Sequence, residues 1–484
     1  MFQMLGQYVP IKSVILALTE SVLILGALLL ATWMRLGSVS ALNHYLSLPY
    51  ASEKFGLIVV VCLVSFYYSD LYDLQVVSRR AELLVRLLQA LGAASLILAL
   101  LFYLLPDLSL GRGISALAAI TVGVLIGAWR LIVDATGSFF RPLHRVLVAG
   151  TGRVGIQLVR TILEHPELHF KVVGFLDERG EDIGKSLVNP GIVAGVADLE
   201  EIVRRERVDR VVVSFTERRG RMPVRQLVRI KLAGVRVEDA HVLYERLTGR
   251  IMLDMLPPST LIFSDGFRVR PILKMFKRLI DIVMASVAIV LLSPLLVLVS
   301  LAIYLESGKP VLFRQQRIGL RGEPFEILKF RTMKQDAEQN GAVWAIEGDP
   351  RITRVGRILR RLRLDELPQF VNVLRGEMSV VGPRPERPEF TTTLETEIPY
   401  YAERHSVRPG ITGWAQIKYR YGSSIEDAKT KLEYDLFYIK HLSPLFDVII
   451  LLRTGQVMIS GTNRQLEVIV SRPAATHPTL QSEV

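Results

Sequence analysis

The sequence of 484 residues contains a single cysteine, Cys62, which lies within an apolar run. One cysteine excludes an intramolecular disulfide and any cysteine-rich metal site, zinc fingers included. The eight histidines are scattered along the chain, and only His165 and His169 lie four residues apart. We therefore expect any metal ion to be held by oxygen atoms, which are the ligands that Mg²⁺ prefers.

Basic residues outnumber acidic ones: Lys and Arg total 59, whereas Asp and Glu total 47. The formal net charge is +12. Half of the residues are hydrophobic, and the mean hydropathy of +0.33 is high for a soluble protein. A basic and apolar chain is typical of a membrane protein that faces anionic headgroups and anionic substrates. Nucleic acid is the rival partner, but no RNP-type motif or basic zipper is present, so we expect no nucleic-acid binding.

Four apolar runs lie within the first 140 residues, and each has about the length of a membrane-spanning helix. The first run is not a cleavable signal peptide, because only Lys12 precedes it and no cleavage site stands out. Arginines cluster after the second and fourth runs, which predicts that the N-terminus, the 73–86 loop and everything after residue 134 are cytoplasmic. The runs are 13–33, 55–72, 87–105 and 113–133.

Two charged residues, Glu20 and Arg130, lie within or near the ends of these runs. They could mark a transport path. We favour the alternative that they pair or reach the interface, because no internal repeat of the transporter kind is visible.

A glycine-rich turn follows a strand-like stretch at 145–150 and precedes a helical pattern at 156–163. Its glycines, Gly150, Gly152 and Gly155, have the GxGxxG spacing, and Asp177 ends the next apolar strand at the position of a ribose-binding acid. Together with strand patterns at 192–196, 208–214 and 234–238, they predict a Rossmann-like domain over 143–248. The turn could hold a dinucleotide or nucleotide sugar, or the glycines could serve only the tight turn and helix packing.

An uncharged run at 282–305 is long enough to cross a membrane, but Ser293-Pro294 interrupts its middle, where proline kinks a helix. Basic residues flank both ends, so both ends favour the cytoplasmic side. We therefore expect a re-entrant helix, which enters one leaflet and returns, instead of a fifth span. The segment after it would lie at the inner membrane surface.

Two adjacent carboxylates, Asp365 and Glu366, follow a strongly basic run. Helical spacing places Arg354, Arg357 and Arg361 on one face, which we expect to contact anionic headgroups. Leu359, Leu362 and Ile358 should supply an apolar face, and Pro368 should end or kink the helix near the carboxylates. An acidic pair in a cationic field suits an anionic substrate and a hard metal ion, although a solvated helix with ordinary salt bridges is the alternative.

The chain after Pro310 is rich in basic residues at turns, which suits phosphate or diphosphate recognition by guanidinium groups. Pro383-Arg384-Pro385 would hold an arginine on a stiff turn. Considered singly, each motif is more often structural; together and in this order they are more specific. The motifs are 329–333 (KFRTM), 364–369 (LDELPQ), 376–386 (GEMSVVGPRPE), 408–417 (RPGITGWAQI), Arg420 and Tyr434-Asp435.

These motifs, with Ser293-Pro294 before them, strongly resemble the bacterial monotopic phosphoglycosyl transferases over about 270–465. The N-terminal extension resembles the large form of that family, as in exopolysaccharide priming enzymes. The resemblance implies transfer of a sugar-1-phosphate from a UDP-sugar to undecaprenyl phosphate, with release of UMP. It implies that Asp365 is the nucleophile, forms a covalent phosphosugar intermediate and binds Mg²⁺, and that Glu366 assists as a base.

Further site residues follow from the same resemblance, by motif position. One departure is Lys418-Tyr419-Arg420-Tyr421, which stands where many members have Asn-Gly-Arg-Asn and leaves the sugar contacts there open. The identity of the sugar is open as well, with glucose or galactose expected. The expected substrate-binding residues are Lys329, Arg331, Arg360, Pro383, Arg384, Pro385, Arg420 and Asp435.

Two other functions compete with this one. A membrane-anchored nucleotide-sugar dehydratase or oxidoreductase would use the Rossmann-like unit, but that unit has no Tyr-xxx-Lys pair and the C-terminal motifs would be unexplained. A non-catalytic scaffold for polysaccharide assembly is disfavoured by the intact carboxylate pair.

We therefore predict a membrane α plus α/β protein of the bacterial inner membrane, with its catalytic domain on the cytoplasmic face. Its partners would be a UDP-sugar, undecaprenyl phosphate, membrane lipids, further copies of itself and downstream glycosyltransferases. The predicted parts are four transmembrane helices (1–140), the Rossmann-like domain (143–248), a linker (249–270), the re-entrant helix with a mostly helical catalytic domain (271–465) and a polar tail (466–484).

Overall fold

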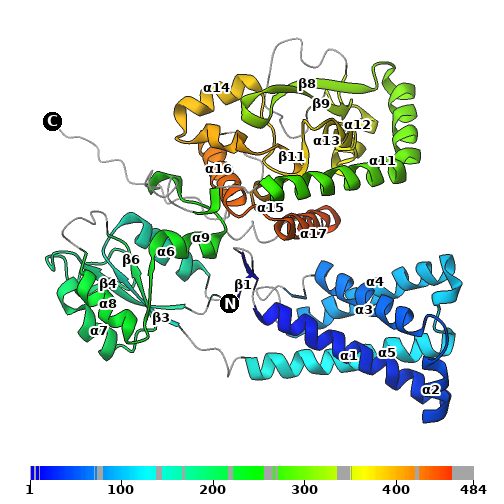
Figure 1. Cartoon of the computed structure of the whole chain (residues 1–484), viewed down its shortest axis with the longest axis horizontal. Helices are drawn as coiled ribbons and strands as arrows, with labels where there is room; N and C mark the ends of the chain where they lie inside the picture. Colours follow the sequence, from blue (N-terminus) through cyan, green and yellow to red (C-terminus); the bar gives the residue numbers. More distant parts are fainter. Residues whose placement is uncertain are drawn as a thin grey trace. The chain divides into compact units, whose positions relative to one another are not determined.

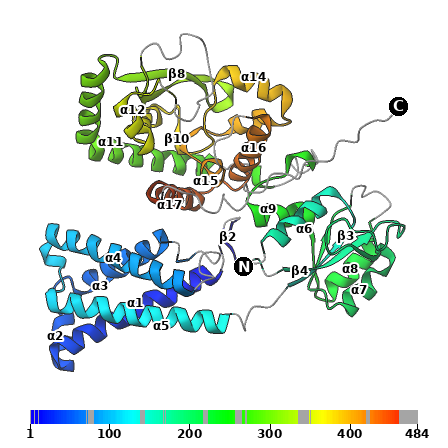
Figure 2. The same cartoon turned by 180° about the vertical axis from the view of Figure 1, so that it is seen from behind.

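A computed structural model of the chain divides into two compact units, Met1–Met4 with Tyr8–Leu243 and Leu5–Gln7 with Tyr244–Val484. Figures 1 and 2 show the chain from opposite sides. Each unit is described by itself below. The residues that the structure describes are 2–4, 7–9, 11–69, 71–72, 80–137, 144–165, 168, 170–215, 222–255, 265–267, 271–334, 349, 351–419 and 424–460.

All four N-terminal apolar runs form helices, and a short helix, α2, follows the first. The helix of the second run, α3, begins and ends about four residues earlier than expected. It starts directly after Pro49-Tyr50. Outward-facing leucines such as Leu88 and Leu96 are 70% and 75% exposed, as expected of helices that face lipid. The bounds are α1 Ile11–Leu36, α2 Val39–Leu46, α3 Ala51–Tyr68, α4 Arg80–Leu104 and α5 Arg112–Gly137.

Glu20 and Arg130 pair with each other in the interior of this helical region, as expected. Arg130 Nε donates to Glu20 Oε1 at 2.5 Å, and both side chains are buried. The Tyr72 hydroxyl donates to the other oxygen of Glu20 at 2.7 Å, and Arg130 also donates to the carbonyl of Leu71. The pair therefore joins α1, α5 and the segment after α3, because each buried charge has a partner.

A five-stranded parallel sheet with the strand order β5-β4-β3-β6-β7 follows the N-terminal helices. Figure 2 shows α6 on one side of the sheet and α7 and α8 on the other. Buried valines and leucines of β3, β4 and β6 form the centre. The elements are β3 His144–Ala149, α6 Arg153–Glu164, β4 Phe170–Asp177, β5 Ile192–Gly195, α7 Leu199–Arg205, β6 Arg210–Val213, α8 Val224–Leu232, β7 Arg236–Asp239 and α9 Ala240–Thr248.

The C-terminal unit is mostly helical, as predicted, with two small sheets. Its core gathers around α16, whose Phe437 stacks on Trp414 with a centroid distance of 6.1 Å. The elements are α11 Pro271–Ser307, β8 Leu312–Ile318, β9 Pro324–Phe330, α12 Arg354–Arg361, η8 Leu364–Glu366, α13 Gln369–Arg375, β10 Ser379–Val381, α14 Pro388–Glu397, η9 Tyr401–Ser406, β11 Gly410–Thr412, α15 Trp414–Lys418, α16 Ile425–Lys440 and α17 Pro444–Ser460.

Helix α11 changes direction along its length, as Figure 1 shows, and it contains Pro294. Proline has no N–H to donate to the carbonyl four residues earlier, that of Val290. The Ser293 hydroxyl donates to this carbonyl at 2.8 Å instead. The Ser-Pro pair therefore removes one backbone hydrogen bond of the helix, and the serine hydroxyl replaces it. Such a replacement stabilises the bend in a membrane, where no water is present to bond the carbonyl.

The two halves of α11 pack on different parts of the unit. Ala285 of the first half is buried in the core around α16, whereas Val299 and Ile303 of the second half pack against Phe330 and Leu359. Several apolar side chains around the bend are exposed, among them Val290, Leu291 and Val297. Among the described residues, five helices are long and apolar enough to cross a membrane: α1, α3, α4, α5 and α11. With the parallel sheet, this composition fits the predicted membrane α plus α/β class.

The stretch predicted as a linker, 249–270, begins with residues that belong to the C-terminal core. Ile251 and Leu253 are buried there, and the Trp414 indole donates to the Gly249 carbonyl at 2.8 Å. Residues 256–264 and 268–270 lie outside the described residues, as does the predicted tail, 466–484.

Candidate active site

The carboxylate pair lies in the single 3₁₀ turn η8, between α12 and α13. The expected position of the helix break is wrong, because α12 ends at Arg361, before the carboxylates, and Pro368 caps the start of α13. Arg363 has φ 54°, a left-handed conformation that turns the chain at this point. Both carboxylates therefore lie on a tight turn and not on a helix face.

Only part of the expected apolar face of α12 is buried. Leu359 is 3% exposed, whereas Ile358 and Leu362 are 59% and 51% exposed. The arginines at 354, 357 and 361 are all exposed. The surface of α12 thus presents apolar and cationic side chains together.

The end of α11 and the segment after β9 fix the start of α12. The Glu306 carboxylate accepts hydrogen bonds from the first N–H groups of α12, those of Arg354 and Val355. A Cβ at Gly356 would lie 2.1 Å from the Thr332 carbonyl oxygen, so only glycine allows this approach. Arg360 Nε donates to the Thr332 hydroxyl at 2.9 Å, and the charge of this guanidinium acts on Asp365.

Glu366 joins three of the sequence motifs. Its Oε1 accepts a hydrogen bond from Arg384 Nη2 at 2.6 Å and lies 3.3 Å from Lys329 Nζ. Arg384 also donates to Gln416 Oε1 at 3.1 Å. The structure therefore brings together Lys329, Glu366 and Arg384, with Asp365 and Arg360 next to them.

The two adjacent carboxyl groups have opposite pKa shifts. Burial raises the pKa of Glu366, but the Arg384 and Lys329 cations outweigh it and hold this pKa well below its ordinary value. Burial, and then the charge of Glu366, raise the pKa of Asp365, although Lys329 and Arg360 oppose the shift. Glu366 is thus a fixed anion. The ionised form of Asp365 is the less stable of the two, so an added cation would stabilise it more than Glu366.

The pKa of Lys329 falls to about 8, chiefly through burial and then through the nearby charge of Arg384. The ammonium group therefore loses its proton more easily than that of an ordinary lysine. Around neutral pH it is still mainly protonated and remains a cation beside Glu366.

Glycines hold the turn that carries Arg384. Strands β10 and β11 pair in parallel, and a Cβ at Gly410 would lie 2.1 Å from the Gly382 nitrogen. The Gly382 N–H donates to the Thr412 carbonyl at 2.9 Å, and the Gly410 N–H donates to the Pro383 carbonyl at 2.8 Å. The glycines of these two motifs are explained by this close backbone approach.

Two predicted substrate-binding residues lie behind the site. Arg331 is 6% exposed, and its Nη2 donates to the Ser307 carbonyl and hydroxyl and to the Gly308 carbonyl, which caps α11. Asp435 is 1% exposed and accepts a hydrogen bond from Arg404 at 2.8 Å. Arg420 lies outside the described residues.

The glycine turn of the sheet domain is occupied by protein groups. The Ser214 hydroxyl accepts a hydrogen bond from the Gly155 N–H at 2.8 Å, and Cβ atoms at Gly150, Gly152 and Gly155 would each lie 2.5 or 2.6 Å from Ser214 atoms. The carboxylate of Asp177 accepts from the N–H groups of its own loop, at 181 and 182. The geometry favours the packing interpretation of these glycines, and a bound nucleotide stays a prediction.

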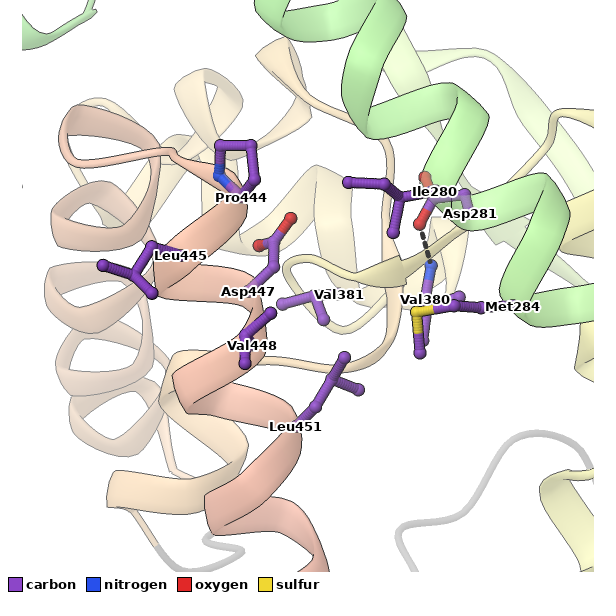
Figure 3. Close-up of a pocket in the computed structure, with 10 residues that line it drawn as sticks. All are labelled: Ile280, Asp281, Met284, Val380, Val381, Pro444, Leu445, Asp447, Val448 and Leu451. Carbon is purple, nitrogen blue, oxygen red and sulfur yellow. Dashed lines mark hydrogen bonds between the residues drawn. The ribbon is translucent and has the colours of Figure 1, made fainter. Parts of the chain in front are cut away.

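A cavity of about 300 Å³ lies among α11, β10 and α17 (Figure 3), and neither carboxylate of the pair is in its lining. Its two acidic residues have internal partners: Asp281 accepts from the Ser379 hydroxyl and the Val380 N–H, and Asp447 pairs with Lys277 at 2.6 Å. These bonds anchor the first half of α11 to β10 and α17. The space that remains is lined mainly by apolar side chains.

Comparison with known proteins gives two family matches. Residues 272–461 match the bacterial sugar transferase family, and residues 68–230 match a family described as a CoA-binding domain. In this structure the Gly155 N–H donates to the Ser214 hydroxyl, and one carboxylate oxygen of Asp177 accepts from the N–H of residue 181.

Individual relatives of this chain are named as sugar phosphate transferases. A UDP-N-acetylgalactosamine-undecaprenyl-phosphate N-acetylgalactosaminephosphotransferase of Aeromonas hydrophila is 45% identical over 237 residues, 49% of this chain and 55% of the relative. A UDP-glucose:undecaprenyl-phosphate glucose-1-phosphate transferase of Klebsiella pneumoniae is 35% identical over 342 residues, 67% of this chain and 70% of the relative. The matched stretch therefore spans little more than half of the first relative. The chain belongs to the bacterial sugar transferases, the phosphoglycosyl transferases, and has the large form of that family.

Proposed function

We propose that this protein transfers a sugar-1-phosphate from a UDP-sugar to undecaprenyl phosphate and releases UMP. The observation that carries this proposal is the Glu366 carboxylate, which Lys329 and Arg384 hold beside Asp365. Such a cluster suits a diphosphate, because the cations can face its oxygens while a carboxylate attacks phosphorus. The names of the matched relatives support the same reaction. None of these findings favours the dehydratase alternative.

In the first step, an Asp365 oxygen attacks the phosphorus that carries the sugar. The bond from this phosphorus to the bridging oxygen breaks, and UMP leaves with the electron pair. In the second step, an oxygen of undecaprenyl phosphate attacks the same phosphorus and the Asp365–phosphorus bond breaks. Splitting the transfer in this way means that a soluble donor and a membrane-bound acceptor need not occupy the site together.

Glu366 is better suited to orient cations than to act as a base. A carboxylate whose pKa is held low by two cations binds a proton weakly. Its fixed charge instead places Lys329 and Arg384 where the negative charge of the diphosphate develops.

The donor set fits Mg²⁺. Among the described residues there is no group of three or more His, Cys, Asp or Glu side chains that could hold a metal. Mg²⁺ is commonly bound by one or two carboxylates together with substrate phosphates and water, so Asp365 could supply the protein ligand. When bound, the ion would neutralise charge on the diphosphate and on the departing UMP.

For the membrane arrangement, we propose that α1, α3, α4 and α5 span the bacterial inner membrane and that α11 is re-entrant. The bend at Ser293-Pro294 and the exposed apolar side chains around it support this. Basic residues before and after α11 support the cytoplasmic location of both ends. The catalytic unit would then lie on the cytoplasmic face, within reach of a lipid headgroup.

The topology can be tested with a cysteine at position 309, just after α11, where the lysine is exposed. In a Cys62→Ala background, we expect the Lys309→Cys variant to resist a membrane-impermeant maleimide in intact cells and to react after permeabilisation. The Asp107→Cys variant, in the loop predicted to be external, should react in intact cells. Reaction at position 309 in intact cells would contradict the re-entrant arrangement.

We propose that the sheet domain is Rossmann-like, and its strand order β5-β4-β3-β6-β7 supports this. We assign it no part in the reaction, because its glycine turn and Asp177 are bonded within the protein.

The proposed function can be tested by measuring UMP release in membranes that contain undecaprenyl phosphate and Mg²⁺. We expect release with one or a few sugars in a panel of UDP-glucose, UDP-galactose and UDP-N-acetylgalactosamine, and much less without the lipid acceptor under multiple-turnover conditions. Release that ignores the acceptor at every time point, or no release with any UDP-sugar, would refute the proposal.

A further inference from the structure

The turn Pro383–Glu386, which carries Arg384, is held by four hydrogen bonds from the surrounding structure. Each of its four carbonyl oxygens accepts one from a group outside the turn, and side chains supply two of the four donors. In chain order the donors are the Gly410 N–H at 2.8 Å, Arg404 Nη2 at 3.0 Å, Arg317 Nη1 at 3.1 Å and the Ile318 N–H at 3.0 Å.

Arg404 is the donor to the carbonyl of Arg384 itself, and it is 5% exposed. Its guanidinium also donates to Asp435 Oδ2 at 2.8 Å and to the Tyr401 hydroxyl at 2.5 Å. The planar fork of an arginine can serve three acceptors at once, which an ammonium group on a flexible chain does poorly.

The charge of Arg404 is compensated by Asp435, which is 1% exposed. Glu386, Lys431 and Tyr401 are the other ionisable groups that act on this pair. A carboxylate so deeply buried and already paired has no free face for a substrate. Its effect on the reaction would have to pass through Arg404.

We propose that Arg404, with Asp435 as its counter-ion, is a positioning residue that holds the Arg384 backbone so that the Arg384 guanidinium reaches Glu366. The inference rests on the proposed function and deepens it. It also gives Asp435 a different role from the substrate contact that the family resemblance implies. Neither residue touches the reacting atoms; both act through Arg384.

Arg404→Lys is the most informative variant. Lysine keeps a positive charge near Asp435 but cannot also hold the Arg384 carbonyl and the Tyr401 hydroxyl. We expect kcat/KM for UMP release to fall about ten- to hundredfold, the effect of losing a hydrogen bond that involves a charged group. A loss of this size could also come from general damage to the fold, so a second measurement is needed.

A double-mutant cycle supplies that measurement. If Arg404 acts through Arg384, its replacement should cost much less in an Arg384→Lys background than in the wild type, because the group it positions is already gone. Arg250→Lys is the matched control, since Arg250 forms an ion pair with Glu433 in the same unit, at 3.4 Å, away from the turn. Its effect should be the same in both backgrounds.

Equal losses from Arg404→Lys in both backgrounds would overturn the inference, as would a change in KM for the UDP-sugar that is independent of Arg384. If Arg404→Lys does not fold, Asp435→Asn serves instead, because an amide oxygen can still accept from Arg404. We expect a smaller loss with the same dependence on Arg384. The cycle takes wild-type UMP release as its reference. If the wild type releases no UMP, the proposed function itself is refuted, and the positioning role with it.

Discussion

Replacing Asp365 by asparagine is expected to abolish UMP release. The amide has nearly the same shape as the carboxylate but is a very weak nucleophile, so the covalent step should stop. The surroundings should change little, since Glu366 keeps Lys329 and Arg384 as partners. The measurement is UMP release from a UDP-sugar in membranes with undecaprenyl phosphate and Mg²⁺.

A single-turnover experiment makes this prediction sharper. Without the lipid acceptor, the wild type should release at most one UMP per enzyme and gain the mass of one phosphosugar, whereas Asp365→Asn should do neither. Asp254→Asn is the matched control, because Asp254 is 62% exposed and pairs with Lys429. Turnover like that of the wild type in Asp365→Asn would rule out the mechanism.

Replacing Glu366 by glutamine should lower kcat by about 10²–10³-fold, the usual cost of removing one charge-stabilising group. Glutamine can still accept a hydrogen bond from Arg384, but the fixed negative charge that holds the two cations is lost. Lys329 and Arg384 should then be less well placed for the diphosphate. We therefore expect both half-reactions to slow, UMP release as well as transfer to the lipid.

The half-reactions also distinguish the two roles considered for Glu366. A base that acts only on the lipid phosphate would leave the first release of UMP intact, and that result would contradict the orienting role. Glu397→Gln, at the exposed end of α14, is the matched control and should keep full activity.

Much of the architecture was predictable because local patterns determine it. Runs of about twenty apolar residues predict membrane helices, and all four N-terminal runs form helices. The strand patterns and the glycine turn predicted a parallel sheet, which the structure contains. The Ser293-Pro294 break was predictable for the same reason, since the loss of an N–H is a property of proline itself.

Some details depended on neighbours that are distant in the sequence. The helix before the carboxylates ends at Arg361 because Arg363 adopts a left-handed conformation, which no pattern in the basic run indicates. Ser214 occupies the glycine turn although it lies about sixty residues from it. Arg404 was missed because it stands outside the recognisable motifs, and only its bond to the Arg384 carbonyl marks it.

The sequence by itself determined which groups are available: two adjacent carboxylates, the lysine and arginines of the motifs, and apolar helices that favour a membrane. Tertiary structure alone decided how they are used. Glu366 became a fixed anion because β9 and the Pro383–Glu386 turn bring Lys329 and Arg384 to it. Asp435 became an internal counter-ion because α16 places it in the core beside Arg404. The physical reason is that burial and charge pairing act through space, so the residue types restrict the chemistry, and the fold assigns each residue its role.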